Sequence, residues 1–226
     1  MATTPAPRIK ICCIETPAEA RLAIDAGASA LGLVSAMPSG PGVIPEERIA
    51  EIAAIVPPPV ATFLLTSLRD PEEIINQHRR CRTSVIQLVA SVTPAARRQL
   101  KAALPGIRLV QVIHVTGEEA LDQAREAALE AHALLLDSGN PGAKVPELGG
   151  TGRVHDWALS RRIVQASPVP VFLAGGLTAE NVAAAIAAVR PFAVDVCSGV
   201  RSEGHLNPGR LRAFFEAVAT GSRVQP

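Results

Sequence analysis

The chemically most suggestive stretch of this chain is an apolar run that ends in a carboxylate. Leu134-Leu135-Leu136 is followed by Asp137, and the loop beyond carries Gly149-Gly150-Thr151-Gly152. A short apolar run of this kind predicts a buried strand. A charged group at the end of such a strand is costly unless it is paired or takes part in chemistry. We therefore expect Asp137 to be a catalytic acid, in a pocket that the rest of the chain builds.

Cys12 is the candidate partner of Asp137, because it lies toward the end of another short apolar run, residues 8–14. A thiolate is a competent base when its pKa is lowered, and a buried carboxylic acid with a raised pKa can donate a proton. The alternative is that Cys12 is an inert core thiol, as free cysteines often are. Asp195, near the end of the run 192–197, could equally be structural, holding a loop amide or an arginine.

Glycines follow the last two predicted strands and favour an anion site. Gly175-Gly176 leads directly into a predicted helix, and Ser198-Gly199-Val200 follows the final strand. Glycine lets backbone N–H groups approach an anion closely, and a helix N-terminus favours negative charge. We expect these loops to bind a phosphate, although Gly175 and Gly176 could simply make a tight turn. Gly150 and Gly152 could help to wrap the phosphate, form a lid, or belong to a surface loop.

The elements that must position these residues are predicted strands and helices, which alternate along the chain. This alternation predicts a single-domain (β/α)8 TIM barrel over residues 1–226, with 1–7 as a flexible lead. A doubly wound sheet is the rival, but Glu15-Thr16-Pro17 stands where its glycine fingerprint would follow the first strand. Strands are expected over 8–14, 28–34, 60–65, 84–88, 108–115, 133–137, 169–174 and 192–197. Helices are expected over 17–26, 45–56, 71–80, 94–104, 117–130, 155–166, 178–189 and 208–219.

In a barrel the carboxyl ends of the strands face the active site. That rule nominates Cys12, Cys13, Ser35, Thr66, Gln87, His114, Asp137, Gly175, Gly176, Asp195 and Ser198. We expect His155 to flank a helix, Cys81 to be structural, and the arginine pairs at 79–80, 97–98 and 161–162 to lie on solvated helix faces.

The amino-acid composition argues against several classes of binding partner. A net charge of +1 and 3% aromatic residues argue against a nucleic-acid surface, which needs basic patches or stacking platforms. No apolar run is long enough for a membrane span, and the first residues lack the apolar core of a secretory signal, so we expect a cytoplasmic protein. The four cysteines form no Cys-x-x-Cys pair, so zinc-ligand spacing is absent and reduced thiols are expected.

Several motifs together resemble the phosphoribosylanthranilate isomerase family. Lys10-Ile11-Cys12 and the segment 27–33 resemble its opening, and Leu136-Asp137-Ser138 with 149–152 resembles its middle. The last third is the most specific, with similarity over 173–182, 190–191, 194–196 and 198–200.

The resemblance implies a (β/α)8 barrel that uses neither metal nor organic cofactor. Its reaction, in tryptophan biosynthesis, is the Amadori rearrangement of phosphoribosyl-anthranilate to a carboxyphenylamino-deoxyribulose phosphate. Asp137 would be the general acid that protonates the furanose oxygen, and Cys12 the general base that removes the proton from the adjacent sugar carbon. The glycines at 175–176 and 198–200 would hold the phosphate of this small-molecule substrate.

Three departures lie on the side that would hold the aromatic acid. Cys13 and Glu15 stand where the family usually has Gly and Thr, and residues 39–43 lack the arginine that pairs with the anthranilate carboxylate. Gln87-Leu88-Val89-Ala90 replaces a Gln-Leu-His-Gly stretch. An isomerase of a different phosphosugar amine and a catalytically silent phosphate-binding paralogue therefore remain alternatives. We expect a monomer or homodimer, with Glu15, Gln87 and Asp195 as further pocket residues.

Overall fold

Eight parallel strands close into a barrel, as predicted, in the computed structural model, which describes residues 6–139 and 155–221. Each strand pairs with its sequence neighbours, and β1 closes the circle by pairing with β8. The strands are β1 (Arg8–Ile11), β2 (Ala30–Val34), β3 (Ala61–Thr66), β4 (Val85–Leu88), β5 (Arg108–His114), β6 (Ala133–Asp137), β7 (Val171–Leu173) and β8 (Ala193–Val196).

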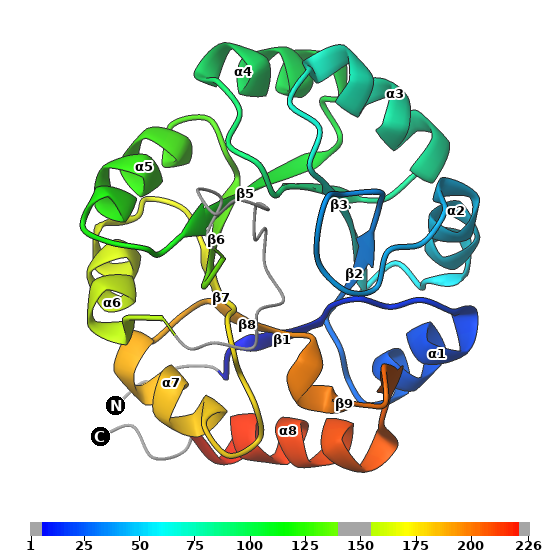
Figure 1. The fold of residues 1–226 in the computed structure, drawn as a ribbon, viewed down its shortest axis with the longest axis vertical. Coiled ribbons are helices and arrows are strands. Elements are labelled where there is room, and N and C mark those ends of the chain that lie inside the picture. The colour runs from blue at the N-terminus through cyan, green and yellow to red at the C-terminus, as the bar shows by residue number, and fades with distance from the viewer. Residues whose placement is uncertain (1–5, 140–154, 222–226) are drawn as a thin grey trace.

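Eight helices ring the barrel (Figure 1). They are α1 (Pro17–Asp25), α2 (Glu46–Ile55), α3 (Pro71–Cys81), α4 (Pro94–Ala103), α5 (Glu119–Ala128), α6 (Trp157–Ala166), α7 (Val182–Val189) and α8 (Pro208–Gly221). Several helices begin at a capping side chain that accepts hydrogen bonds from the amides of the first turn. These caps are Thr16, Asp70, Thr93 and Asp156. None of the described helices is long and apolar enough to cross a membrane.

Apolar side chains fill two concentric layers. Small and branched residues such as Leu134, Leu136 and Ala185 pack between the sheet and the helices. A second cluster fills the barrel interior, where Phe63 and Phe172 meet edge to face with ring centroids 5.8 Å apart. Since parallel strands are buried on both faces, their sequences are almost continuously apolar. The polar residues on these strands therefore stand out, and three of them, Thr66, His114 and Asp137, are the last residues of their strands.

The strand register brings distant polar residues to one end of the barrel. His114 on β5 is level with Asp137 on β6, and Lys10 on β1 is level with Asp195 on β8. The carboxyl ends of β1, β6 and β8 therefore open onto the same mouth.

The structure departs from the predicted elements at a few boundaries. The helix expected over 178–189 begins only at Val182, because the Asn181 side chain accepts from the Thr178 amide and donates to the Gly176 carbonyl, which holds a turn. The strand expected over 8–14 ends at Ile11. After β8 the chain adds a 3-10 turn, η1 (Ser198–Val200), and a short hairpin, β9 (Arg201–Ser202) with β10 (His205–Leu206).

The expectation of a solvated Arg97 is wrong. Its side chain is only 1% exposed, because the guanidinium reaches inward to the Val92 carbonyl, the Gln111 side chain and Glu126. A long side chain on a helix can thus lie between two elements while keeping its charge paired.

Candidate active site

A cavity of about 70 Å³ opens at the carboxyl ends of the strands and gathers most of the predicted site residues. Of these, Cys12, Cys13, Gln87, Asp137, Gly175, Gly176, Asp195 and Ser198 line it. The other walls come mainly from Met37, Ser39, Gly40 and Pro41 after β2, and from Val89 after β4. The ends of several strands thus line one cavity, as the rule for barrels predicts, and its role as the active site stays a prediction.

Asp137, the last residue of β6, is buried at the base of this cavity. Its Oδ1 accepts a hydrogen bond of 2.7 Å from the Ser138 amide. Burial raises the pKa of the Asp137 carboxyl to about 6, with a further contribution from Asp195, while the Ser138 amide and Lys10 oppose the shift. A carboxyl with such a pKa is well suited to give up and regain a proton near neutral pH.

Lys10 and Asp195 form a buried ion pair in the barrel interior. Lys10 Nζ lies 2.8 Å from Asp195 Oδ2, and the two side chains are 0% and 7% exposed. Burial opposes the charge on Lys10, but Asp195 and the nearby thiols of Cys12 and Cys13 hold the Lys10 pKa above its ordinary value. The other carboxylate oxygen, Asp195 Oδ1, is buried without a hydrogen-bond partner among the described residues, and Asp195 lines the cavity.

The Cys12 thiol lies close to this ion pair. A hydrogen bond from the Cys13 side chain and the charge of Lys10 lower the pKa of the Cys12 thiol, against the effect of burial. A Cβ built on Gly32 of the neighbouring strand β2 would lie 2.7 Å from Cys12 Sγ and 3.1 Å from Lys10 Nζ. Gly32 therefore leaves the space that both groups occupy.

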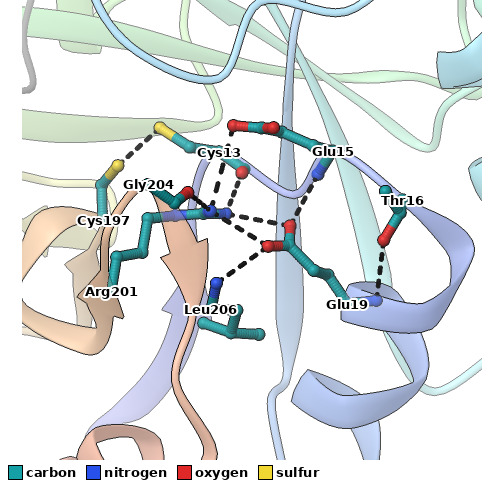
Figure 2. A network of polar contacts seen from close by, with 8 residues as sticks. All are labelled: Cys13, Glu15, Thr16, Glu19, Cys197, Arg201, Gly204 and Leu206. Carbon is teal, nitrogen blue, oxygen red and sulfur yellow. Dashed lines mark hydrogen bonds and ion pairs between the residues drawn. The ribbon is translucent and has the colours of Figure 1, made fainter.

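Cys13 and Cys197 join the first and last loops of the barrel. Their thiols are in contact, and hydrogen bonding to Cys12 and Cys197, together with burial, raises the pKa of the Cys13 thiol. Cys13 has a left-handed backbone, with φ of 61°. Figure 2 shows its carbonyl accepting from Arg201 on β9. A fixed carbonyl partner of this kind helps to hold the unusual backbone next to Cys12.

Arg201 also links the first turn of α1 to the hairpin through Glu19. Arg201 Nη1 lies 3.1 Å from Glu19 Oε1, which also accepts from the Leu206 amide (Figure 2). Glu15 lies 3.9 Å from Arg201 and is not among the residues that line the cavity. Its expected place in the pocket is therefore wrong, because the loop turns its side chain toward Arg201.

The loops after β7 and β8 meet at one wall of the cavity. Gly175 and Gly176 have φ of 85° and 61°, a conformation that side-chain-bearing residues rarely adopt. Gly199 lies against the other loop so closely that a Cβ there would be 2.0 Å from the Leu177 carbonyl oxygen. The two loops thus form one unit, with Ser198 on the cavity side and Gly199 behind it.

Other nominated residues lie elsewhere. Ser35 and Thr66 do not line this cavity, and His114 lines a neighbouring one. His155 precedes the Asp156 cap of α6 and bonds to Ser160 and to the Ala174 carbonyl, as expected of a residue flanking a helix. Cys81 is buried in the core, as expected. The predicted phosphate contacts Gly150 and Gly152 lie outside the described residues.

Sequence reasoning assigned no role to Lys10. The available signal was a lysine inside a run of isoleucines, which is costly unless a carboxylate faces it. Among residues 6–139 and 155–221, no group of three or more His, Cys, Asp or Glu side chains is placed to hold a metal ion.

Comparison with known proteins gives a consistent picture. Residues 9–217 match the family model for N-(5'-phosphoribosyl)anthranilate (PRA) isomerase. The chain is 38% identical over 212 residues to N-(5'-phosphoribosyl)anthranilate isomerase of Methanocella arvoryzae, covering 93% of this chain and 97% of that protein. It is 39% identical over 211 residues to the enzyme of the same name from Moorella thermoacetica, covering 93% and 89%.

Solved structures agree. The crystal structure of phosphoribosyl anthranilate isomerase from Thermus thermophilus superposes with a TM-score of 0.79 at 29% identity, covering 94% of this chain and 98% of that one. The Thermotoga maritima enzyme gives 0.81 at 29% identity, covering 95% and 99%. A complex of a phosphoribosyl anthranilate isomerase with reduced 1-(o-carboxyphenylamino)-1-deoxyribulose 5-phosphate gives 0.79 at 26% identity, covering 95% and 99%. With its closed barrel and the match over residues 9–217, this chain belongs to the N-(5'-phosphoribosyl)anthranilate isomerase family.

Proposed function

We propose that this cavity isomerises N-(5'-phosphoribosyl)anthranilate to 1-(o-carboxyphenylamino)-1-deoxyribulose 5-phosphate, with Asp137 as general acid and Cys12 as general base. The observation that carries the proposal is that one cavity is lined by a carboxyl whose pKa is raised and by a thiol whose pKa is lowered. Burial raises the pKa of Asp137 to about 6, which favours its protonated form relative to an ordinary carboxyl, and a hydrogen bond from Cys13 and the charge of Lys10 lower the pKa of the Cys12 thiol, which favours its thiolate. Groups whose environments push their pKa values in this way suit acid and base roles.

In the first step Asp137 gives its proton to the ring oxygen of the ribosylamine. The bond from that oxygen to C1 breaks, and the nitrogen lone pair forms the C1–N double bond of an iminium ion. The positive charge on nitrogen then makes the C2 proton acidic. Asp137 becomes a carboxylate near Lys10, which favours the charged form.

In the second step the Cys12 thiolate takes the proton from C2, and the electrons form a C1–C2 double bond while neutralising the nitrogen. The resulting enolamine takes a proton at C1 and releases the proton of its 2-hydroxyl group, giving the ketone. Protons gained and lost are equal, so the product is an isomer of the substrate. Lys10 assists this step because its charge favours the thiolate of Cys12.

The glycine-rich wall suits the sugar phosphate. Gly175, Gly176 and Ser198 border the cavity. Amides presented by glycines and by turns bind phosphate oxygens through charge-assisted hydrogen bonds. Phosphate held there would place the reacting carbons between Cys12 and Asp137.

The test is the loss of anthranilate-type fluorescence when purified protein meets phosphoribosyl-anthranilate generated in situ. The wild-type chain should turn the compound over, and Asp137→Asn or Cys12→Ala should lower kcat by about 10²–10⁴-fold. Cys81→Ala is the matched cysteine control, since Cys81 is buried away from the cavity, and it should retain kcat. A wild-type chain without turnover would contradict the function. Activity that survives either substitution would contradict that residue's role.

A further inference from the structure

The aromatic half of the substrate must lie on the side of the mouth away from β7 and β8. In a closed ring of eight strands, β3 and β4 are half a turn from β7 and β8. The proposed substrate carries its phosphate at C5 and its aryl amine at C1, with the reacting carbons between them. A phosphate held by the loops after β7 and β8 therefore directs the aryl group over the ends of β3 and β4.

A second and larger cavity reaches that side, lined by the loops after β2, β3 and β4 and by residues of β5 and α5. It measures about 390 Å³ and adjoins the catalytic cavity, because Val89 after β4 lines both. The loop after β2 also separates the two, with Met37 lining the first cavity and Pro38 the second. The catalytic cavity of about 70 Å³ is smaller than sites for drug-sized molecules, which span roughly 300–1,000 Å³. A substrate with a ring and a phosphosugar therefore needs the adjoining space.

The two cavities differ in the charges that they offer. The described lining of the catalytic cavity contains Asp137 and Asp195 but no lysine or arginine side chain. Lys10, beneath it, is committed to Asp195. A benzoate-type carboxylate close to these two acids would be repelled, so its binding requires a cation farther along the mouth.

Arg69, in the loop between β3 and α3, supplies that cation. It lines the second cavity together with Ser67, Ser91 and Thr116, which add hydroxyl donors to the same rim. Arg69 is exposed, and it forms no ion pair with any residue in the described ranges. The adjacent Asp70 is engaged elsewhere, since its Oδ1 accepts from the Glu72 and Glu73 amides at the start of α3.

The other arginine of this cavity is already used. Arg97 donates to the Val92 carbonyl and to Gln111, and it forms an ion pair with Glu126. Its charge is therefore neutralised within the protein.

We infer that Arg69 binds the aryl carboxylate of the substrate and thereby takes the place of the arginine that residues 39–43 lack. The inference rests on the proposed function, because it assigns a residue to the aromatic half of that substrate. A guanidinium matches a carboxylate with two parallel hydrogen bonds, and the loop after β3 presents it on the side opposite the phosphate. Arg69 is a specificity-determining residue and takes no part in proton transfer.

The experiment compares Arg69→Met with the wild type on two ligands, the reduced product analogue and the same compound without its carboxyl group. Calorimetric titration should show that Arg69→Met weakens binding of the carboxylated analogue about 10-fold, the lower end of the range for a charged hydrogen bond. Binding of the decarboxylated analogue should stay within about 2-fold, and Arg69→Lys should restore part of the loss. Arg79→Met is the matched control, since Arg79 is exposed on α3 and lines neither cavity.

Turnover of phosphoribosyl-anthranilate provides the second readout. Arg69→Met should raise KM while kcat stays within about 3-fold, because an interaction made equally in ground and transition states changes KM alone. Equal affinity of wild type and Arg69→Met for the carboxylated analogue would overturn the inference, whatever the turnover. A wild-type chain that binds the analogue through Arg69 but shows no turnover would instead overturn the proposed function and leave the inference standing.

Discussion

The ends of β6 and β8 present the same residue type in two different electrostatic settings. Asp137 closes β6 and Asp195 lies near the end of β8, and both side chains are buried. Asp195 has Lys10 at 2.8 Å, whereas Asp137 has the Ser138 amide at 2.7 Å and no ion pair among the described residues. Burial raises both pKa values, but only Asp195 has an ammonium group in direct contact.

The difference teaches that position at a strand end does not by itself define a catalytic acid. A cation in contact with a buried carboxyl favours the charged form and opposes the effect of burial, so such a carboxyl can support a neighbouring charge. A buried carboxyl with only an amide partner can hold a proton near neutral pH and transfer it. The group that contacts the buried carboxyl, an ammonium group or only a backbone amide, therefore distinguishes a charge-supporting carboxyl from a proton-transferring one.

Of the three substitutions considered, removal of the Lys10 ammonium group should change the free energy of unfolding most. Lys10→Met leaves Asp195 buried without a counter-ion, which typically costs about 3–5 kcal/mol. Urea unfolding at pH 8 should show this loss in the free energy of unfolding, and the loss should be smaller at pH 5, where Asp195 can take up a proton. The Cys12 thiol should also react more slowly with iodoacetamide at pH 7, because its pKa rises.

Lys101→Met is the control for that measurement. Lys101 forms a surface pair with Glu130 and is 38% exposed, so its loss should change the free energy of unfolding by less than about 1 kcal/mol. Equal effects of the two substitutions would show that Lys10 and Asp195 are not a tightly coupled pair.

Replacing the Asp137 carboxyl at the end of β6 by an amide should increase the free energy of unfolding, and the increase should depend on pH. The Asp137 carboxyl has a pKa raised from 3.8 to about 6, so the folded state binds the proton more tightly than the unfolded chain. That stabilisation is complete below pH 3.8 and is lost as the pH rises through 6. Asp137→Asn does not titrate, so it should exceed the wild type by up to about 3 kcal/mol at pH 8 and match it near pH 4.

Urea unfolding of Asp137→Asn and wild type at pH 4, 6 and 8 measures this directly. A constant difference across that range would mean that the carboxyl of Asp137 is not perturbed by burial. A wild type that is more stable at pH 8 would mean that an unrecognised cation compensates the carboxylate.

The loop after β8 should show the smallest of the three effects. In Gly199→Ala the new methyl group would meet the Leu177 carbonyl, so the two phosphate-side loops must separate, at a cost of about 1–3 kcal/mol. KM should rise by about 10-fold with a smaller change in kcat, because the loops are proposed to bind a group remote from the reacting carbons. Gly106→Ala, where a Cβ meets nothing within 4 Å, is the control and should leave KM unchanged.

Much of the fold could be predicted because its determinants are local. Alternating apolar runs and amphipathic segments predicted every strand and helix of the barrel, and caps such as Thr16 and Thr93 stand directly before the helices that they begin. Asp137 stood out for a local reason too, as a carboxylate directly after three leucines. The comparisons support the family assignment, while the roles of Asp137 and Cys12 remain predictions.

What could not be predicted depends on partners far apart in sequence. Lys10 and Asp195 are separated by 185 positions, and only barrel closure makes them neighbours. Arg97 was placed on a solvated face because its helix looks polar, yet Glu126 and Gln111 on other elements draw it inward. Glu15 was assigned to the pocket because it stands where the family usually has Thr, but its side chain lies 3.9 Å from Arg201, far away in sequence.

Gly32 shows how a strand can contribute to a site through the side chain that it does not have. Its backbone is not in the left-handed region, so no conformational requirement excludes other residues there. What excludes them is the neighbouring strand β1, because the Cβ that any substitution would add lies 2.7 Å from Cys12 Sγ and 3.1 Å from both Cys12 Cα and Lys10 Nζ. How well other residues are tolerated at position 32 therefore depends on the side chains that β1 places against it. In a survey of variants at position 32, Cys12→Ala should relax the selection for glycine only in part, because Cys12 Cα and Lys10 Nζ still lie 3.1 Å from the added Cβ.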